Sequence, residues 1–218
     1  NPASVLVGDF LYSRAFQMMA ALDSPALIRV MADATNTIAA GEVLQLMNSG
    51  DPDTTEIRYM EVIYRKTARL FEAGAQIAAI VARAPAGVEA ALARYGKHLG
   101  IAFQLVDDAL DYRGDAEELG KNVGDDLAEG KPTLPLIHAL RHGDAASIAM
   151  IRSAIEQGGT EEQGPILAVV ESTGGLDYTA QLADEEARRA GDALADVPAS
   201  AYRDAIAALA RFAVNRSA

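Results

Sequence analysis

The pattern of apolar and polar positions along the chain predicts helices throughout. Apolar residues recur at three- and four-residue spacings in segment after segment, which is the periodicity of amphipathic helices. No run of β-branched or aromatic residues alternates with polar ones between turn signals, so no strand is predicted. The predicted helices span 3–22, 26–47, 55–82, 87–112, 132–142, 145–157, 163–172, 177–195 and 200–216. We therefore expect an all-α fold, a large helical bundle.

Several helix ends carry recognisable signals. Ser4 is a candidate cap for the first helix, and Ser24-Pro25 combines a cap with proline at the first helical position of the second. Turn residues gather at 48–53, and Pro85 separates the third helix from the fourth. There is no internal repeat and no linker with a shift in composition. We expect residues 1–218 to form a single domain.

Composition narrows the classes of function. Half of the 218 residues are hydrophobic and 23% are charged, as in a folded protein with a sizeable core. The lack of cysteine excludes disulfides, thiol nucleophiles and thiolate metal sites. A net charge of −12 argues against a broad nucleic-acid surface, so an anionic ligand needs metal ions or a few well-placed cations. No apolar run is long enough to span a membrane and no signal peptide is visible, which predicts a soluble cytoplasmic protein.

Three aspartates share one helical segment. Asp107 and Asp111 are four residues apart and lie on one helix face, and Asp108 lies about 100° round from Asp107. At an effective dielectric constant of 20, two charges 6 Å apart repel by roughly 3 kcal/mol. A bound cation relieves this repulsion, and ligands that are all oxygen favour Mg²⁺. The alternative, a solvated acidic face, fits a bare motif of this length equally well.

The residues after this cluster favour a diphosphate site. Lys121 and Lys131 lie on glycine-containing loops ten residues apart, with Asp125 and Asp126 between them. Carboxylates that hold Mg²⁺, next to lysines on a loop, suit a diphosphate, because metal and lysine together neutralise its charge. Upstream, the pair Lys66-Thr67 stands in an apolar helical segment, where a lysine either reaches solvent or pairs with an anion.

The segments FQLVDDALDY and GKNVGDDLAEGKPTLP resemble the second aspartate-rich motif and the following loop of the trans-isoprenyl diphosphate synthases. SVLVGDFLYSRAF, GEVLQL and YRKTARLFEA match other parts of the same family. The match is strongest to the long-chain branch, which makes octaprenyl-type diphosphates for quinone side chains. The resemblance implies an all-helical, dimeric, Mg²⁺-dependent prenyltransferase. Its substrates would be an allylic prenyl diphosphate and isopentenyl diphosphate, joined head to tail.

The resemblance also implies roles for individual residues. Asp107, Asp108 and Asp111 would hold Mg²⁺, with Asp108 the least directly involved. Lys66, Lys121 and Lys131 would bind the diphosphate or its metals. Thr67 and Gln104 would place oxygen dipoles near the allylic cation, and Phe103 would line the site near the second substrate. Glu42 and Gln45 match the family in mainly structural positions, and for Asp9 a packing role is as plausible as catalysis.

One departure affects the assignment. The family carries a first aspartate-rich motif, followed by arginines that hold isopentenyl diphosphate, upstream of the segment that matches residues 1–4; this sequence has neither. Since the sequence also opens with Asn1 and not with methionine, we expect it to correspond to the C-terminal two-thirds of a complete domain.

Two other functions stay open. One is a non-catalytic helical partner of an active synthase, which would explain the lack of the first motif. The other is a class I terpene cyclase, which is disfavoured because 107–115 lacks that class's second metal motif. The pair His138 and His142 has the spacing of zinc ligands, but a surface or capping role is expected because no third ligand is evident. Tyr12 and Phe16 are expected in the core.

Overall fold

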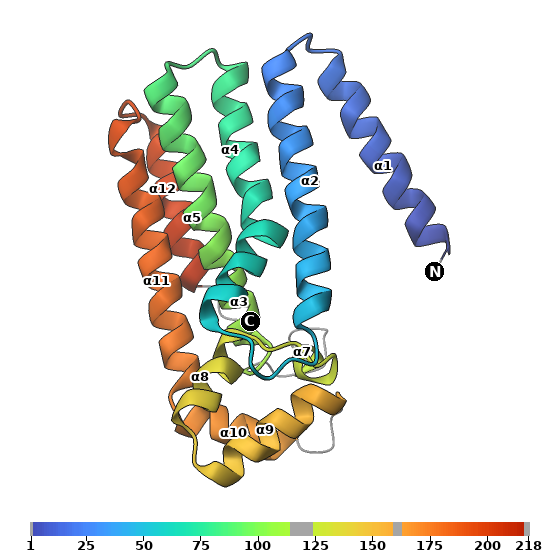
Figure 1. Cartoon of the computed structure of the whole chain (residues 1–218). Helices are drawn as coiled ribbons and strands as arrows, with labels where there is room; N and C mark the ends of the chain where they lie inside the picture. The colour runs from blue at the N-terminus through green and yellow to red at the C-terminus, as the bar shows by residue number, and fades with distance from the viewer. Residues whose placement is uncertain (1, 114–123, 159–162, 216–218) are drawn as a thin grey trace.

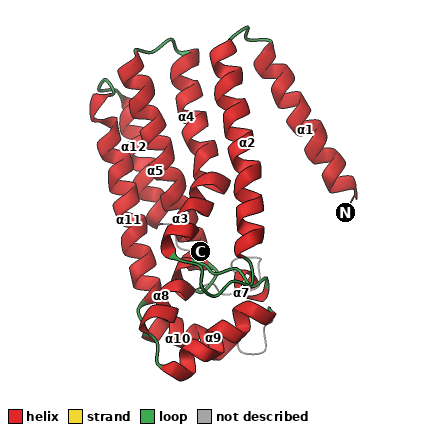
Figure 2. Ribbon diagram, viewed as in Figure 1, coloured by secondary structure: helices red, strands yellow, loops and turns green. Residues whose placement is uncertain are grey.

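The computed structural model of the chain describes residues 2–113, 124–158 and 163–215. Throughout these ranges the regular elements are helices joined by loops (Figure 2), so the prediction of an all-α fold is confirmed. The long helices are α1 (Pro2–Ala20), α2 (Pro25–Asn48), α4 (Arg69–Val81), α5 (Ala86–Leu110), α11 (Gly175–Ala193) and α12 (Ala201–Asn215). The shorter elements are α3 (Glu56–Ile63), η1 (Tyr64–Ala68), α7 (Asp125–Ala128), α8 (Leu134–His142), α9 (Ala145–Gln157), α10 (Gln163–Ser172) and η2 (Leu194–Asp196).

Helix α5 is the centre of the bundle. It packs along α4 on one side and α11 on the other, and α2 lies beyond α4 (Figure 1). Helices α8, α9 and α10 close the lower end, while α1 slants away from α2 (Figure 1). One core cluster includes Tyr59, Ile63, Leu105 and Leu134, so it joins α3, α5 and α8. This packing brings the C-terminal parts of α2 and α5 to the same end of the bundle.

Most predicted helix ends agree with the structure within a few residues, and two differ for clear reasons. The hydroxyl of Ser24 caps α2 by accepting a hydrogen bond from the Leu27 N–H at 3.4 Å, as predicted. The prediction that Ser4 caps the first helix is wrong, because α1 already begins at Pro2, whose fixed φ suits a first helical turn. The segment at Asp125, expected as loop, forms the short helix α7.

The predicted helix over 55–82 contains an irregular turn. At η1 the backbone forms a π-helical turn, in which the Arg69 N–H donates to the Tyr64 carbonyl five residues earlier. Such a turn inserts one extra residue into the helix and changes the direction in which its side chains point. Lys66 and Thr67 lie in this turn.

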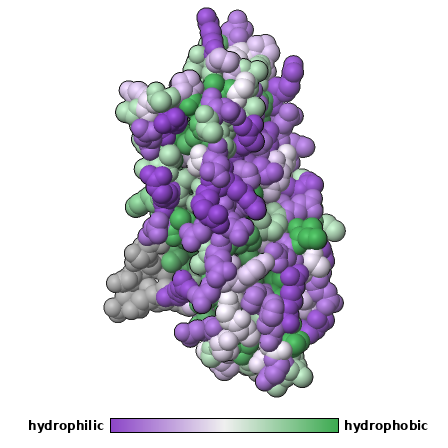
Figure 3. Space-filling view, turned by 90° about the vertical axis from the view of Figure 1, so that its left-hand side faces the viewer, coloured by the Kyte–Doolittle hydropathy of each residue, from purple (hydrophilic) through white to green (hydrophobic). Residues whose placement is uncertain are grey.

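The outer helices differ in how polar their surfaces are. On α1 many large apolar side chains are exposed. Tyr12 is 55% exposed and Phe16 is only partly buried, so the prediction that both lie in the core is wrong. The two rings instead contact each other, with centroids 4.9 Å apart. On the side of the bundle that carries α11, hydrophilic residues cover most of the middle of the surface (Figure 3). In the described part of the chain, every helix is too short or too polar to cross a bilayer.

Candidate active site

A cavity of about 290 Å³ lies where α2 and α5 end. Its walls come from α2, α3, η1, α5, α7 and the loop before α8. Six of the residues predicted from the sequence line it: Lys66, Thr67, Gln104, Asp107, Asp108 and Lys131. Together with Asp126 of α7, which also lines the cavity, these residues bring carboxylates and amines from four separate segments to one small space.

The carboxylate of Asp108 is a buried polar group of the cavity, since the residue is only 4% exposed. Its Oδ2 accepts a hydrogen bond from the Tyr59 hydroxyl at 2.6 Å, and its Oδ1 accepts one from Gln104 Nε2 at 2.7 Å. The same Gln104 amide reaches Asp107 Oδ2 at 3.3 Å. Burial, and after it the charge of Asp126, raises the pKa of Asp108 to about 7. The carboxylates of Asp107, Asp108 and Asp126 thus lie close together in a cavity where water screens their charges poorly.

Asp111 and Asp126 face each other beside this pair. Asp111 follows the last turn of α5 and accepts a hydrogen bond from the Asp126 backbone N–H at 3.2 Å. Burial and the charge of Asp126 raise the pKa of Asp111 to about 6. Asp126 lines the cavity, whereas the structure does not place Asp111 among the lining residues. The sequence signal for Asp126 was its position between two lysines, but spacing in a loop does not predict where a side chain points.

The two lysines of the cavity are held by different partners. Lys66 Nζ donates to Gln45 Oε1 at 2.7 Å and lies 3.5 Å from Glu42 Oε2. Both partners belong to α2. The resemblance implies a mainly structural role for Gln45, but this residue also lines the cavity. These contacts orient the ammonium group from one side and leave Lys66 at the cavity wall.

Lys131 approaches from the loop before α8. Its Nζ lies 3.0 Å from Asp126 Oδ1 and 2.6 Å from Glu129 Oε2. Burial lowers the pKa of Lys131, but hydrogen bonds to Glu129 and Asp126 raise it by more, so its pKa lies above the ordinary value. Lys131 is therefore a permanent positive charge next to the carboxylates.

Thr67 and Gln104 are joined directly. The Thr67 hydroxyl donates to Gln104 Oε1 at 2.8 Å, so a hydrogen-bonded chain runs from Thr67 through Gln104 to Asp108. Phe103 is not among the lining residues, and its ring packs on Phe71 with centroids 5.4 Å apart. Its predicted role near a second substrate stays a prediction. Lys121 lies outside the described residues.

The donor set fits a hard divalent cation that is bound together with a phosphate ligand. Among the described residues, no three acidic or histidine side chains form a group that could hold a metal ion on its own. Mg²⁺ needs no such group, since it is usually held by one or two carboxylates and completes its shell with water and substrate phosphates. Asp107 and Asp108 would supply these carboxylates, and the raised pKa of Asp108, which comes first from its burial, fits a carboxylate whose charge a cation would compensate.

Comparison with known proteins places the chain in a family. The family model described as "Polyprenyl synthetase" matches residues 1–172. The chain is 57% identical to the octaprenyl diphosphate synthase of Haemophilus influenzae and 56% identical to that of Escherichia coli. The alignments cover 100% and 99% of this chain but 66% and 67% of those proteins.

A solved structure agrees with these relatives. The polyprenyl synthase of Caulobacter crescentus, which was crystallised with calcium and isoprenyl diphosphate, superposes with a TM-score of 0.95 at 43% identity. The superposition covers the whole of this chain and 67% of that one. On this evidence the chain belongs to the polyprenyl synthetase family.

Proposed function

We propose that the chain is the larger part of a Mg²⁺-dependent long-chain trans-prenyltransferase. The enzyme condenses an allylic prenyl diphosphate with isopentenyl diphosphate, head to tail, and repeats the step to build a long all-trans polyprenyl diphosphate for a quinone side chain. The observation that carries the proposal is the cavity in which Asp107 and Asp108 face Lys66 and Lys131. The names of the relatives, octaprenyl and nonaprenyl diphosphate synthases, support the long-chain product.

Each group in the cavity has a task in this reaction. Lys66 and Lys131 bind oxygens of the allylic diphosphate through charge-assisted hydrogen bonds. Asp107 and Asp108, with Asp111 behind them, would hold Mg²⁺, which neutralises the diphosphate and so makes it a better leaving group. The Thr67 hydroxyl oxygen keeps lone pairs available after donating to Gln104, and these lone pairs stabilise the positive charge that develops on the allylic carbon.

Two other functions are compatible with the fold. A non-catalytic partner subunit has no need of a carboxylate and lysine cavity, and the presence of this cavity favours the enzyme. A class I terpene cyclase ionises a similar diphosphate, but the relatives that match the whole chain are synthases. A cytoplasmic location stays a prediction.

Binding of an uncleavable allylic diphosphate analogue tests the proposal. Calorimetric titration of the chain should show binding with Mg²⁺ and little without it, and Asp107→Asn should abolish the Mg²⁺-dependent part. Asp196→Asn is the matched control, because this carboxylate is exposed on η2 and pairs with Arg94 outside the cavity. If the folded chain binds the analogue equally well with and without Mg²⁺, or not at all, the proposed site is wrong.

We also propose that the chain forms a homodimer through α1 and α2. Both helices expose apolar side chains, among them Leu6, Phe10 and Leu11 on α1 and Leu46 and Met47 on α2. Exposed apolar side chains that gather on neighbouring helices are typical of protein interfaces. Sedimentation equilibrium should give a dimer that Phe10→Glu dissociates, and a monomer at micromolar concentration would contradict the proposal.

A further inference from the structure

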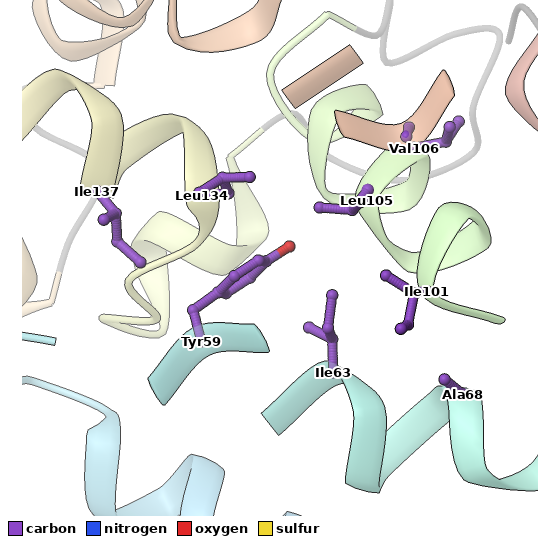
Figure 4. Packing of buried hydrophobic residues seen from close by; sticks show 9 residues of the cluster. Tyr59, Ile63, Ala68, Ile101, Leu105, Val106, Leu134 and Ile137 are labelled. Atoms are coloured by element: carbon purple, nitrogen blue, oxygen red, sulfur yellow. The ribbon is translucent and has the colours of Figure 1, made fainter. Parts of the chain in front are cut away.

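Tyr59 brings a hydroxyl into an apolar cluster. The residue belongs to α3 and is 4% exposed. Its ring lies between Leu105 of α5 and Leu134 of α8, with Ile63 of its own helix nearby (Figure 4). Its hydroxyl donates to Asp108 Oδ2 at 2.6 Å, across 49 residues of sequence.

Packing in the apolar cluster does not by itself explain why residue 59 is a tyrosine. A phenylalanine would fill the same space without a polar group to bury, and a buried hydroxyl is unfavourable unless it is hydrogen bonded. The Tyr59 hydroxyl meets this requirement, because it donates to the Asp108 carboxylate.

The hydrogen bond fixes how the Asp108 carboxylate is turned. Tyr59 of α3 holds Oδ2, and Gln104 of α5 holds Oδ1 at 2.7 Å. Two donors on opposite oxygens prevent rotation about the terminal torsion of the side chain. Each carboxylate oxygen can accept two bonds, so both keep a lone pair for a cation in the cavity.

We infer that Tyr59 is a positioning residue, whose hydroxyl holds the Asp108 carboxylate in the orientation that a diphosphate-bound divalent cation requires. The inference rests on the proposed function, since it assumes that Asp108 binds such a cation. Tyr59 lies on α3, so this helix contributes to the site although it contains neither the three aspartates nor the lysines of the cavity. Groups that orient metal ligands in this way typically change metal affinity 10- to 100-fold when they are removed.

Tyr59→Phe tests the inference, and Tyr95→Phe is its matched control. Tyr95 is buried to the same degree, at 5% exposed, and its hydroxyl donates to the Ile206 carbonyl at 2.8 Å in a different core cluster. Both variants delete one buried, hydrogen-bonded hydroxyl. We expect similar decreases in melting temperature, but only Tyr59→Phe should weaken Mg²⁺ binding, by roughly 10- to 100-fold, in calorimetric titrations with inorganic pyrophosphate present.

A double variant separates positioning from a general loss of structure. If Tyr59 acts through Asp108, Tyr59→Phe should cause no further loss of Mg²⁺ affinity once Asp108→Asn is present. NMR of the unaltered chain with ¹³Cζ-labelled tyrosine reports on the Tyr59 hydroxyl without any substitution of that residue. The Tyr59 resonance should shift when Mg²⁺ and pyrophosphate are added, and the Tyr95 resonance should not.

The outcomes distinguish a failure of the inference about Tyr59 from a failure of the proposed function. If the unaltered chain binds Mg²⁺ with pyrophosphate and Tyr59→Phe binds as well, the inference is overturned and the proposed function stands. Equal effects of Tyr59→Phe and Tyr95→Phe, or a Tyr59 resonance that does not move, also overturn the inference. If the unaltered chain shows no Mg²⁺-dependent binding, both the proposed function and the inference fail.

Discussion

Gly41 is the point at which α2 touches the turn that carries Lys66 and Thr67. A Cβ atom at this position would lie 2.8 Å from the Lys66 backbone nitrogen and 2.8 Å from the Arg65 Cβ. Such distances are shorter than van der Waals contact, and one of the two atoms belongs to the backbone. In Gly41→Ala, η1 must therefore move away from α2, together with the ammonium group that Gln45 holds in the cavity.

The stability of Gly41→Ala depends on two opposing free-energy contributions. Alanine in place of glycine inside a helix stabilises by about 0.5–1 kcal/mol. Overpacking a close contact destabilises by about 1–3 kcal/mol. Gly74→Ala on α4 isolates the first term, because a Cβ there meets no atom within 4 Å. Since the helix term cancels in the comparison, Gly41→Ala should be less stable than Gly74→Ala by about 1–3 kcal/mol, or roughly 2–12 °C in melting temperature.

Thermal unfolding and pyrophosphate titration in the presence of Mg²⁺ measure the two consequences. A displaced Lys66 loses a charged hydrogen bond worth about 1.5–3 kcal/mol, so affinity should decrease on the order of tenfold or more in Gly41→Ala. Gly74→Ala should bind as the unaltered chain does. If Gly41→Ala is as stable as Gly74→Ala and binds equally well, the close packing of α2 on η1 does not position the lysine.

Three further perturbations have defined outcomes. Lys131→Met should weaken pyrophosphate binding about tenfold or more, since it removes a charged donor, and titrations that show no change would exclude Lys131 from the site. Asp108→Asn should weaken Mg²⁺ binding at least as much as Tyr59→Phe does, with Asp107 keeping a residual affinity, yet stabilise the metal-free protein by up to about 4 kcal/mol at pH 8. The raised pKa of Asp108, about 7, means that its ionisation destabilises the fold progressively above pH 3.8; the gain should therefore disappear near pH 4. Burial raises the pKa of Glu186, but the hydrogen bond with His98 at 2.6 Å and nearby positive charge bring it below 4.5. This pair therefore stabilises the fold above that pH and stops doing so as the pH falls further. In His98→Gln, the melting temperature should therefore be lower than that of the unaltered chain above pH 4.5, and this difference should shrink as the pH falls further; a difference that does not change with pH would contradict the role of the pair.

The sequence was sufficient for the elements and for the groups that act within one element. Helical periodicity predicted most boundaries, because apolar spacing reports which face of a helix is buried. The proximity of Asp107 and Asp108 to Gln104 also followed from local geometry, since residues three and four apart on a helix are neighbours. The motif resemblance added the family, which the comparisons confirm.

Contacts between segments depended on the packing of whole helices. Tyr59 reaches Asp108 across 49 residues, and Lys66 reaches Gln45 across 21. Asp126 enters the cavity because α7 folds back beside the end of α5. The π-helical turn at η1 has no signature in the periodicity of its segment, and it coincides with the close approach of α2 at Gly41. Spacing along a chain determines neighbours only within a turn or two of helix. The partners of a buried carboxylate are determined by which helices share a core, and that depends on the packing of the whole bundle.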